Sequence, residues 1–318
     1  LKKFNISNSE ARSFTQNLFN RLMFTRFIEK KSWLKFNNSN KYLFELFKAG
    51  DFKNEGFYKG RLLKLFFEGF SNEEINKNEA YGEVNFFGGE LFDKTELDTK
   101  VKDIPNYLFS EILGSDGLFY KYNFTVEEST PLETEVSIDP EMLGKVFEEL
   151  VTGRTESGAF YTPKSIVEFM CKKSLSSFLN SIELIQGKEK FNKEEKELLL
   201  IKVQRLKVLD PACGSGAYLI GMLNEILKVF QNLENKNEDQ IDKYKLKLNI
   251  IQNSIYGVDI DSVAIQIAKL RLWLTLVVEY DGDKPQPLPN LNFKIEQGNS
   301  ISSNLIENNE PDLFSIKF

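Results

Sequence analysis

Hydrophobic and polar positions in the second half of the chain predict a strand that leads into a helix. Leu206 to Leu209 form a short, mostly apolar run that ends at Asp210, and apolar residues then recur every three or four positions from Leu219 to Phe230. Such a change of period is typical of a buried strand followed by an amphipathic helix. The turn between them contains Gly214 and Gly216.

The same order recurs further along the chain. Ile255 to Val258 are predicted to form a second strand that ends at Asp259, and the apolar segment from about Ser262 favours a buried helix. Asn292 to Glu296 are predicted to form a third strand, with Asn299 just beyond its end.

The first part of the chain, residues 1–135, is predicted to be a mainly α-helical domain rich in phenylalanine. Within Asn17 to Leu34 the apolar residues have helical spacing. The basic residues of this helix are interpreted as its solvated side rather than as DNA contacts: Arg21, Arg26, Lys30 and Lys31. Gly88-Gly89 is interpreted as a turn in a small hairpin.

Residues 136–318 are predicted to form the N-terminal part of a second domain. It is expected to begin with a helix over 139–153, followed by a polar connection. The next helix is predicted to have Thr162 as its N-cap and Pro163 at its first position. Gln231 to Leu248 are polar and are interpreted as an insertion before the second strand.

The glycine turn is predicted to cradle a ligand. Gly214 and Gly216 allow positive φ and leave the backbone N–H groups at the following helix start accessible. A dinucleotide fits less well, because Leu219 stands where close helix–strand packing requires a small residue. A nucleoside triphosphate also fits less well, because its phosphates would meet the carboxylate of Asp210.

S-adenosylmethionine combines charges that suit this turn. Its carboxylate can lie at the helix N-terminus, and its cationic groups can lie near Asp210. The carboxylate of Asp259, at the second strand end, can accept both ribose hydroxyls. A glycine-containing turn without a ligand and a solvated acid at Asp259 are the alternatives.

Two further positions have both a functional and a structural interpretation. The amide of Asn299 can donate to and accept from an adenine edge, but an asparagine in a turn also caps the local backbone. The helix start at Thr162 offers free N–H groups to a carboxylate, although it can equally be a well-capped helix and nothing more.

Composition narrows the functional classes. The 318 residues carry a net charge of −6, which argues against this chain being the main DNA-gripping surface. The chain has no histidine, so His-based triads and His-containing metal sites are excluded, and no metal is expected. Two cysteines give no disulfide framework, and no apolar run approaches the roughly 18 residues of a membrane span. We therefore expect a cytoplasmic protein without membrane contact.

Together these segments resemble the adenine-N6 DNA methyltransferases of the gamma motif order, and are most similar to the type IIG restriction–modification enzymes. The resemblance is strongest over residues 143–303. It rests on GAFYTP at 158–163, DPACGSG at 210–216 and the predicted strand that ends at Asp259. Asn17 to Leu34 and Asn85 to Asp93 are similar to segments of the helical region that precedes the methyltransferase core in type IIG enzymes.

The resemblance implies a role in S-adenosylmethionine binding for ten residues. Phe160, Tyr161 and Thr162 would lie near the methionine moiety. The glycine-rich motif would surround the amino-acid part through Asp210, Ala212, Gly214 and Gly216. Asp259 matches the ribose-binding acid, and Ile260 the residue that packs on the adenine ring. Asn299 matches the contact to the adenine amino edge, where many relatives have Asp.

The family's catalytic tetrapeptide, (Asn/Asp/Ser)-Pro-Pro-aromatic, is absent because the sequence contains no Pro-Pro pair. In the family this motif holds a flipped adenine. We therefore expect the catalytic residues downstream of Phe318, together with a target-recognition domain that makes most contacts to double-stranded DNA. Whether a nuclease domain precedes Leu1 is left open.

The expected architecture is therefore α/β: a mainly helical N-terminal domain, followed by a partial Rossmann-like sheet of an S-adenosylmethionine-dependent methyltransferase. The favoured function is site-specific methylation of adenine N6 in DNA, within a restriction–modification or related phage-defence enzyme. Methylation of a protein glutamine, and a non-catalytic scaffold that retains the fold, are the alternatives.

Overall fold

The computed structural model describes residues 5–74, 76–121, 123–124, 137–138, 162–179, 191–234, 242–280, 282 and 284–301. Phe160 and Tyr161, the helix predicted over 139–153 and the domain boundary predicted after residue 135 lie outside these residues.

The N-terminal part of the chain is mainly helical, as predicted. Its helices are α1 (Asn8–Glu29), α2 (Tyr42–Lys48), the π-helical segments η2 (Tyr58–Leu62) and η3 (Leu65–Gly69), the 3-10 helix η4 (Glu90–Phe92), α3 (Glu96–Lys100), α4 (Tyr107–Leu113) and α5 (Leu118–Lys121). Its strands are β1 (Lys77–Asn78) and β2 (Gly82–Glu83), which form an antiparallel pair, and β3 (Asn123–Phe124) and β4 (Ser137–Ile138), which form a parallel pair.

The C-terminal part contains a three-stranded parallel sheet in the order β5-β6-β7. Its elements are α8 (Lys164–Leu179), α10 (Lys193–Gln204), β5 (Val208–Asp210), α11 (Ala217–Glu234), α12 (Lys243–Asn253), β6 (Ile255–Asp259), α13 (Ser262–Glu279) and β7 (Ile295–Gln297). Parallel neighbours require crossover connections. Here α11 and α12 connect β5 to β6, and α13 connects β6 to β7. The first two strands and the helices that follow them lie where the sequence predicted them, and the third strand is shorter than predicted.

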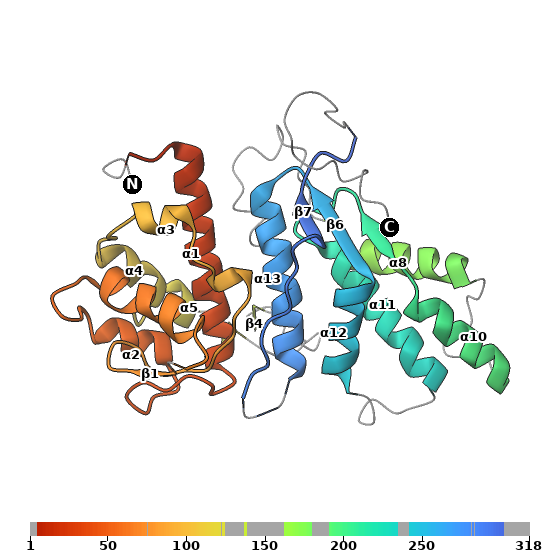
Figure 1. Cartoon of the computed structure of the whole chain (residues 1–318), viewed down its shortest axis with the longest axis horizontal. Helices are drawn as coiled ribbons and strands as arrows, with labels where there is room; N and C mark the ends of the chain where they lie inside the picture. Colours follow the sequence, from red (N-terminus) through yellow and green to blue (C-terminus); the bar gives the residue numbers. More distant parts are fainter. Residues whose placement is uncertain are drawn as a thin grey trace.

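Helix α13 lies between the sheet and the N-terminal part, with α1 alongside it (Figure 1). Its residues from Ile267 to Val277 are all buried, because the helix has neighbours on opposite sides. Lys31 donates to the carbonyls of Val278 and Tyr280 at the C-terminal end of α13, over 2.9 and 3.1 Å. The buried apolar side chains of both parts belong to one continuous cluster.

The interpretation of the basic residues of α1 as a solvated side is wrong for its arginines. Arg21 is 2% exposed and forms a bidentate salt bridge with Asp98. Its Nη1 lies 2.8 Å from Oδ1 of Asp98, and its Nη2 lies 3.1 Å from Oδ2. Arg26 is 5% exposed, pairs with Glu29 and donates to the carbonyl of Phe119. These guanidinium groups therefore connect α1 to segments that are distant in the sequence.

The Gly88-Gly89 turn is not a hairpin turn, contrary to the prediction. Both glycines have positive φ, 59° and 75°, and they lead into η4. Phe87 and Phe92 flank them and pack edge to face against Phe24, with ring centroids 5.4 and 5.6 Å apart. The hairpin of the N-terminal part is β1–β2 instead.

The segment Gln231 to Leu248 is only partly the polar insertion that the sequence suggested. Its beginning belongs to α11, and its end belongs to α12, whose N-cap is Asp242. Lys247 is 3% exposed and pairs with Glu279 of α13 over 2.5 Å. Residues 235–241 lie outside the described part of the chain.

The Arg21–Asp98 pair yields a stability prediction. Burial by itself raises the pKa of Asp98, but the hydrogen bonds and the charge of Arg21 outweigh it and hold the pKa below its usual value. Asp98→Ala leaves a buried guanidinium without its anion, so we expect the free energy of unfolding at pH 7 to fall by about 3–5 kcal/mol. Urea unfolding measures this loss.

Because the folded-state pKa of Asp98 is lowered, its contribution is present above the unfolded-state pKa of about 3.9 and is lost as pH falls through the folded-state value. The difference between Asp98→Ala and wild type should therefore shrink in acid. The control is Lys35→Ala, which removes an ion pair whose side chains are 66% and 50% exposed and should cost less than about 1 kcal/mol. Equal losses in the two variants would contradict the assignment.

Candidate functional site

The carboxyl ends of β5, β6 and β7 meet at one edge of the sheet. Asp210 pairs in register with Gly257, so Asp259 lies two residues beyond the point where β5 ends. Asp259 pairs in turn with Gln297. The turn after β5 bends over the end of β6, because the N–H of Cys213 donates to the carbonyl of Val258 over 2.9 Å. The structure thereby brings Asp210, the glycine turn and Asp259 together at this edge of the sheet.

Asp259 joins the glycine turn to the start of α13. Its Oδ2 accepts from the N–H of Gly214 over 2.8 Å, and its Oδ1 accepts from the N–H of Asp261 over 2.9 Å. Asp261 is the N-cap of α13 and accepts from the N–H of Val263. The sequence had suggested either a contact to a ligand or a solvated acid, so these backbone contacts are an additional role of the carboxylate.

The shape of the turn depends on both of its glycines. Gly214 has φ 52° with open space where a Cβ would lie, so its backbone conformation is the reason for glycine. Gly216 has φ 85°, and a Cβ there would lie 3.1 Å from that of Ala268 on α13. The N–H of Gly216 donates to the carbonyl of Cys213 over 2.8 Å and closes the turn.

Asp210 carries an unsatisfied oxygen at the mouth of this turn. Its Oδ1 accepts from the N–H of Ala212 over 3.1 Å, whereas its Oδ2 is buried and has no hydrogen-bond partner among the described residues. Burial and the neighbouring charge of Asp259 raise the pKa of Asp210 above its usual value. An ionised carboxylate in this position favours a cation beside it.

The segment after β7 reaches the glycine turn. Ser300 donates its hydroxyl to the carbonyl of Pro211 over 2.6 Å, and the amide of Gln297 donates to the carbonyl of Ile260 over 3.1 Å. Ile260 is 68% exposed beside this segment. Asn299 is exposed and its Oδ1 accepts from the N–H of Ile301 over 3.0 Å, which is the local capping contact that the sequence left open. Nothing in the sequence pattern had singled out Ser300 or Gln297.

Helix α8 begins one residue later than predicted. The carbonyl of Pro163 accepts from the N–H groups of Ile166 and Val167, so Pro163 rather than Thr162 precedes the helix. The helix lies close to α11, since a Cβ at Gly221 would be 2.5 Å from Val167. Thr162 lies on the wall of a cavity that Ala217, the first residue of α11, also lines. The starts of α8 and α11 therefore both border this cavity.

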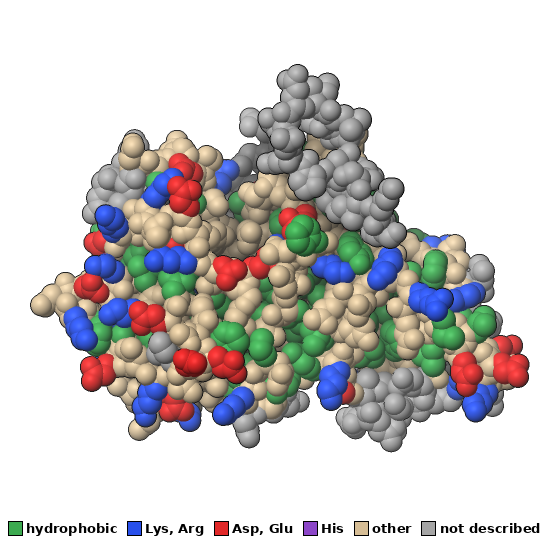
Figure 2. All heavy atoms as spheres, in the orientation of Figure 1, with side chains coloured by type: hydrophobic (Ala, Val, Ile, Leu, Met, Phe, Trp, Pro, Cys, Tyr) green, Lys and Arg blue, Asp and Glu red, His purple; other side chains and the backbone are tan. Residues whose placement is uncertain are grey.

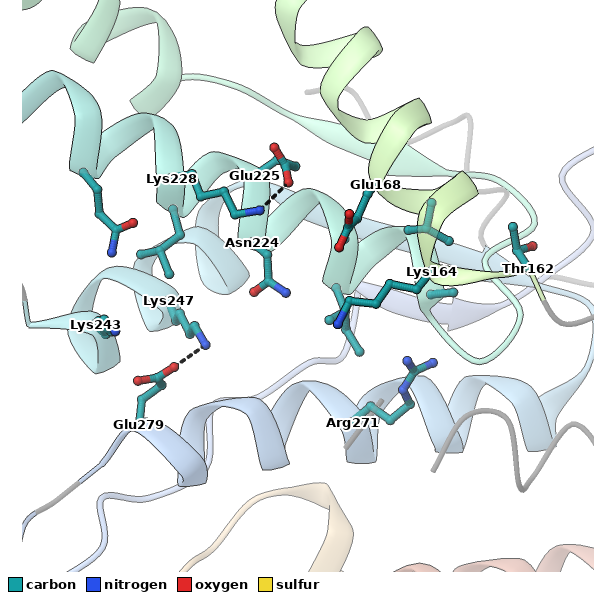
Figure 3. A pocket seen from close by; sticks show the side chains of 16 residues that line it. Thr162, Lys164, Glu168, Asn224, Glu225, Lys228, Lys243, Lys247, Arg271 and Glu279 are labelled. Atoms are coloured by element: carbon teal, nitrogen blue, oxygen red, sulfur yellow. Dashed lines mark hydrogen bonds and ion pairs between the residues drawn. The ribbon is translucent and has the colours of Figure 1, made fainter. Parts of the chain in front are cut away.

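This cavity has a volume of about 280 Å³ and extends along α11 between α8, α12 and α13 (Figure 3). Its described wall is strongly charged, with Lys228 paired to Glu225 over 2.8 Å and Lys247 paired to Glu279. Neither Asp210 nor Asp259 lines it. The cavity is therefore adjacent to the strand-end site without being that site.

The described ranges contain neither a membrane-spanning helix nor a metal site. No helix of these ranges is sufficiently long and apolar to cross a membrane. These ranges also contain no group of three or more His, Cys, Asp and Glu side chains arranged to hold a metal ion.

Several known proteins are similar to this chain in sequence or in fold. Residues 186–303 match the family model described as "MmeI, DNA-methyltransferase domain". These residues include β5, β6 and β7 and the turns between them. Among solved structures, that of the type IIL restriction–modification enzyme MmeI in complex with DNA is similar, with a TM-score of 0.55 and 20% sequence identity over 83% of this chain and 33% of that one. At this identity the likeness shows the fold alone.

Curated relatives cover different shares of the chain. A putative type II restriction enzyme and methyltransferase of Methanocaldococcus jannaschii is 30% identical over 96% of this chain. DNA methyltransferase A of Bacillus subtilis is 24% identical over 72%, and the adenine-specific methyltransferase PglX of Streptomyces coelicolor is 25% identical over 41%. The chain spans 28%, 25% and 9% of these relatives' own lengths.

The family match and the curated relatives point to DNA methyltransferases, and the solved structure has a similar fold. The chain therefore resembles the DNA methyltransferases of type II restriction–modification systems, as the sequence motifs predicted, and carries a match to the MmeI methyltransferase domain.

Proposed function

We propose that this chain forms the S-adenosylmethionine-binding part of a DNA methyltransferase that modifies adenine at N6, in a restriction–modification or related phage-defence enzyme. The observation that carries the proposal is the buried, unpartnered Oδ2 of Asp210 beside a glycine turn. A turn that needed no ligand would have little reason to bury a carboxylate oxygen without a hydrogen-bond donor.

The methionine part of the cofactor matches the charges around the turn. Its ammonium group would donate to Oδ2 of Asp210, which satisfies the oxygen and compensates its burial. Its carboxylate would lie at the start of α11, where the first N–H groups of a helix have no intrahelical acceptor. Thr162 lines the same cavity as Ala217, the first residue of α11. We propose that Phe160 and Tyr161, which precede it, complete this end of the site.

The ribose and adenine would lie toward β6 and β7. Each oxygen of Asp259 already accepts one backbone N–H, and a carboxylate has acceptor sites for about two more hydrogen bonds, as two ribose hydroxyls require. Ile260 is exposed next to it and can pack on the adenine ring. Asn299 would contact the adenine edge through its side-chain amide. The proposed fold for these strands is the first half of a Rossmann-like sheet.

When bound, the cofactor supplies an electrophilic methyl group on its sulfonium. The residues of this chain would hold it, whereas the sequence contains no Pro-Pro motif to hold a flipped adenine. We therefore propose that methyl transfer needs residues outside the 318 present here. The adenine assignment is supported by the name of the relative PglX, and DNA as substrate by the complex of MmeI with DNA.

The surface charge of this chain supports the proposal that other regions of the enzyme bind most of the DNA. Figure 2 shows that, on the face in view, Lys and Arg are interspersed with Asp and Glu over the N-terminal part. A phosphate-binding surface needs basic residues in excess. We propose that target-recognition regions make most of the contacts to double-stranded DNA. We also propose that the whole enzyme acts in the cytoplasm, where its substrate is.

The first test is Asp259→Ala, measured by calorimetric titration with S-adenosylmethionine. Loss of charge-assisted hydrogen bonds to the ribose should cost about 2–4 kcal/mol, or roughly 30- to 1000-fold in affinity. Asp242→Ala is the matched control, since it also removes a carboxylate that accepts a backbone N–H but lies at the start of α12. Wild-type affinity in a folded Asp259→Ala protein would remove this residue from the site.

A second test uses Asp210→Asn, which should affect stability and binding in opposite directions. Because burial raises the folded-state pKa of Asp210, wild-type stability without cofactor is lost as pH rises from about 3.9 through that pKa. The variant lacks this loss, so its melting temperature at pH 7 should equal or exceed that of wild type. Its melting-temperature increase with S-adenosylmethionine should be smaller. An unchanged ligand-induced increase would contradict the proposed ammonium contact.

The third test concerns the reaction. Genomic DNA from a host that expresses the whole enzyme should contain N6-methyladenine at a defined short sequence, as measured by long-read sequencing. Residues 1–318 alone should bind the cofactor but incorporate no tritiated methyl group into unmethylated DNA. DNA-dependent incorporation by residues 1–318 would refute the assignment of catalysis to other residues, and transfer only to a protein glutamine would refute DNA as substrate.

A further inference from the structure

Ser215 occupies the centre of the glycine turn and faces inward. It lies between Gly214 and Gly216, both of which have positive φ, and it is only 3% exposed. A ligand at the mouth of the turn would therefore meet the backbone rather than this side chain. The orientation of the Ser215 peptide groups determines where the neighbouring N–H groups point.

Arg271 contacts this residue from α13. Its Nη1 donates to the carbonyl of Ser215 over 2.7 Å and lies 3.2 Å from the Ser215 hydroxyl. The arginine is 3% exposed, so its charge is removed from water and directed at the turn. Figure 3 shows Arg271 extending from α13 toward α8, at the end of the cavity where Thr162 lies.

Helix α13 and the end of β6 hold the glycine turn at three points. Asp259, just before the helix, accepts from the N–H of Gly214. Ala268 is the close neighbour of Gly216, and Arg271 follows it by three residues on the same helical face. The two polar contacts hold the peptide units on either side of the Gly214–Ser215 peptide, through the N–H of Gly214 and the carbonyl of Ser215. The turn can therefore neither rotate nor move away from α13 without losing one of them.

We propose that Arg271 is a positioning residue that fixes the ligand-binding conformation of the glycine turn. It acts through the Ser215 carbonyl and places a buried positive charge beneath the turn, at the N-terminus of α11, which favours an anionic ligand group there. The ligand in question is the cofactor of the proposed function, so the affinity part of this inference rests on that proposal.

The experiment compares Arg271→Met and Arg271→Lys with Lys247→Met. Lys247 is an equally buried cation that lines the same cavity but pairs with Glu279, so it controls for the loss of a buried charge. We expect S-adenosylmethionine affinity, measured by calorimetry, to fall about 10- to 100-fold in Arg271→Met and to remain within about threefold of wild type in Lys247→Met. Arg271→Lys, which can still donate to one carbonyl, should restore affinity to within about tenfold.

Amide hydrogen exchange in the protein without ligand separates this inference from the proposed function. Peptides covering Cys213 to Ala217 should exchange at least about tenfold faster in Arg271→Met, and nearer to the wild-type rate in Arg271→Lys. If wild type binds no S-adenosylmethionine but the turn still loosens in Arg271→Met, the proposed function fails and the positioning role stands. Unchanged exchange in the turn, or wild-type affinity in Arg271→Met, would overturn the inference. If Arg271→Met does not fold, the comparison of Arg271→Lys with wild type decides by the same two measurements.

Discussion

The carboxylate of Asp259 is the interaction on which the site depends. It accepts one N–H from the glycine turn and one from the start of α13, so a single side chain fixes the spacing between β5, β6 and the helix that follows. A charge-assisted hydrogen bond to a carboxylate is stronger than a hydrogen bond between neutral groups. Without it, the turn would have to satisfy the Gly214 N–H elsewhere, and the two strand ends would no longer form one surface.

Helix α13 extends this constraint to the rest of the molecule. One side of it contacts the sheet and the glycine turn, and the other lies along α1. Lys269 pairs with Glu90 over 2.7 Å, and the same carboxylate accepts from the N–H of Leu291 in the segment that leads into β7. Phe87 and Phe92, on either side of Glu90 in the sequence, pack against Phe24 of α1. The N-terminal part therefore supports the segment that precedes β7. Through β7 it also supports the strand-end surface to which Asn299 and Ser300 belong.

The parts of this fold that could be predicted from the sequence are those with local signals. The strand ends at Asp210 and Asp259 and the helices after them follow from changes of hydrophobic period and from turn residues, which lie within a few positions of one another. The roles of Arg21 and Arg26 could not be predicted in this way, because Asp98 and Phe119 are 77 and 93 residues away from them. A charged residue on a helix is usually solvated, and only the tertiary fold shows the exception.

The site shows the same division. Residue types at the strand ends indicated a cofactor that carries both charges. The contacts of Asp259 with Gly214, of Ser300 with Pro211 and of Arg271 with Ser215 could not be predicted, because they join residues 45, 89 and 56 positions apart in the sequence. The one-residue shift at Thr162 has a local cause, since the Pro163 carbonyl is the first to accept from the helix.

The central claim, that this strand-end surface holds S-adenosylmethionine, is tested most directly by a crystal structure of residues 1–318 soaked with S-adenosylhomocysteine, the demethylated product. The account predicts that the amino group of the ligand lies within hydrogen-bond distance of Asp210 Oδ2 and that both ribose hydroxyls contact Asp259. A ligand bound in the charged cavity along α11, or one whose amino group faces solvent while Asp210 Oδ2 stays unpaired, would contradict it.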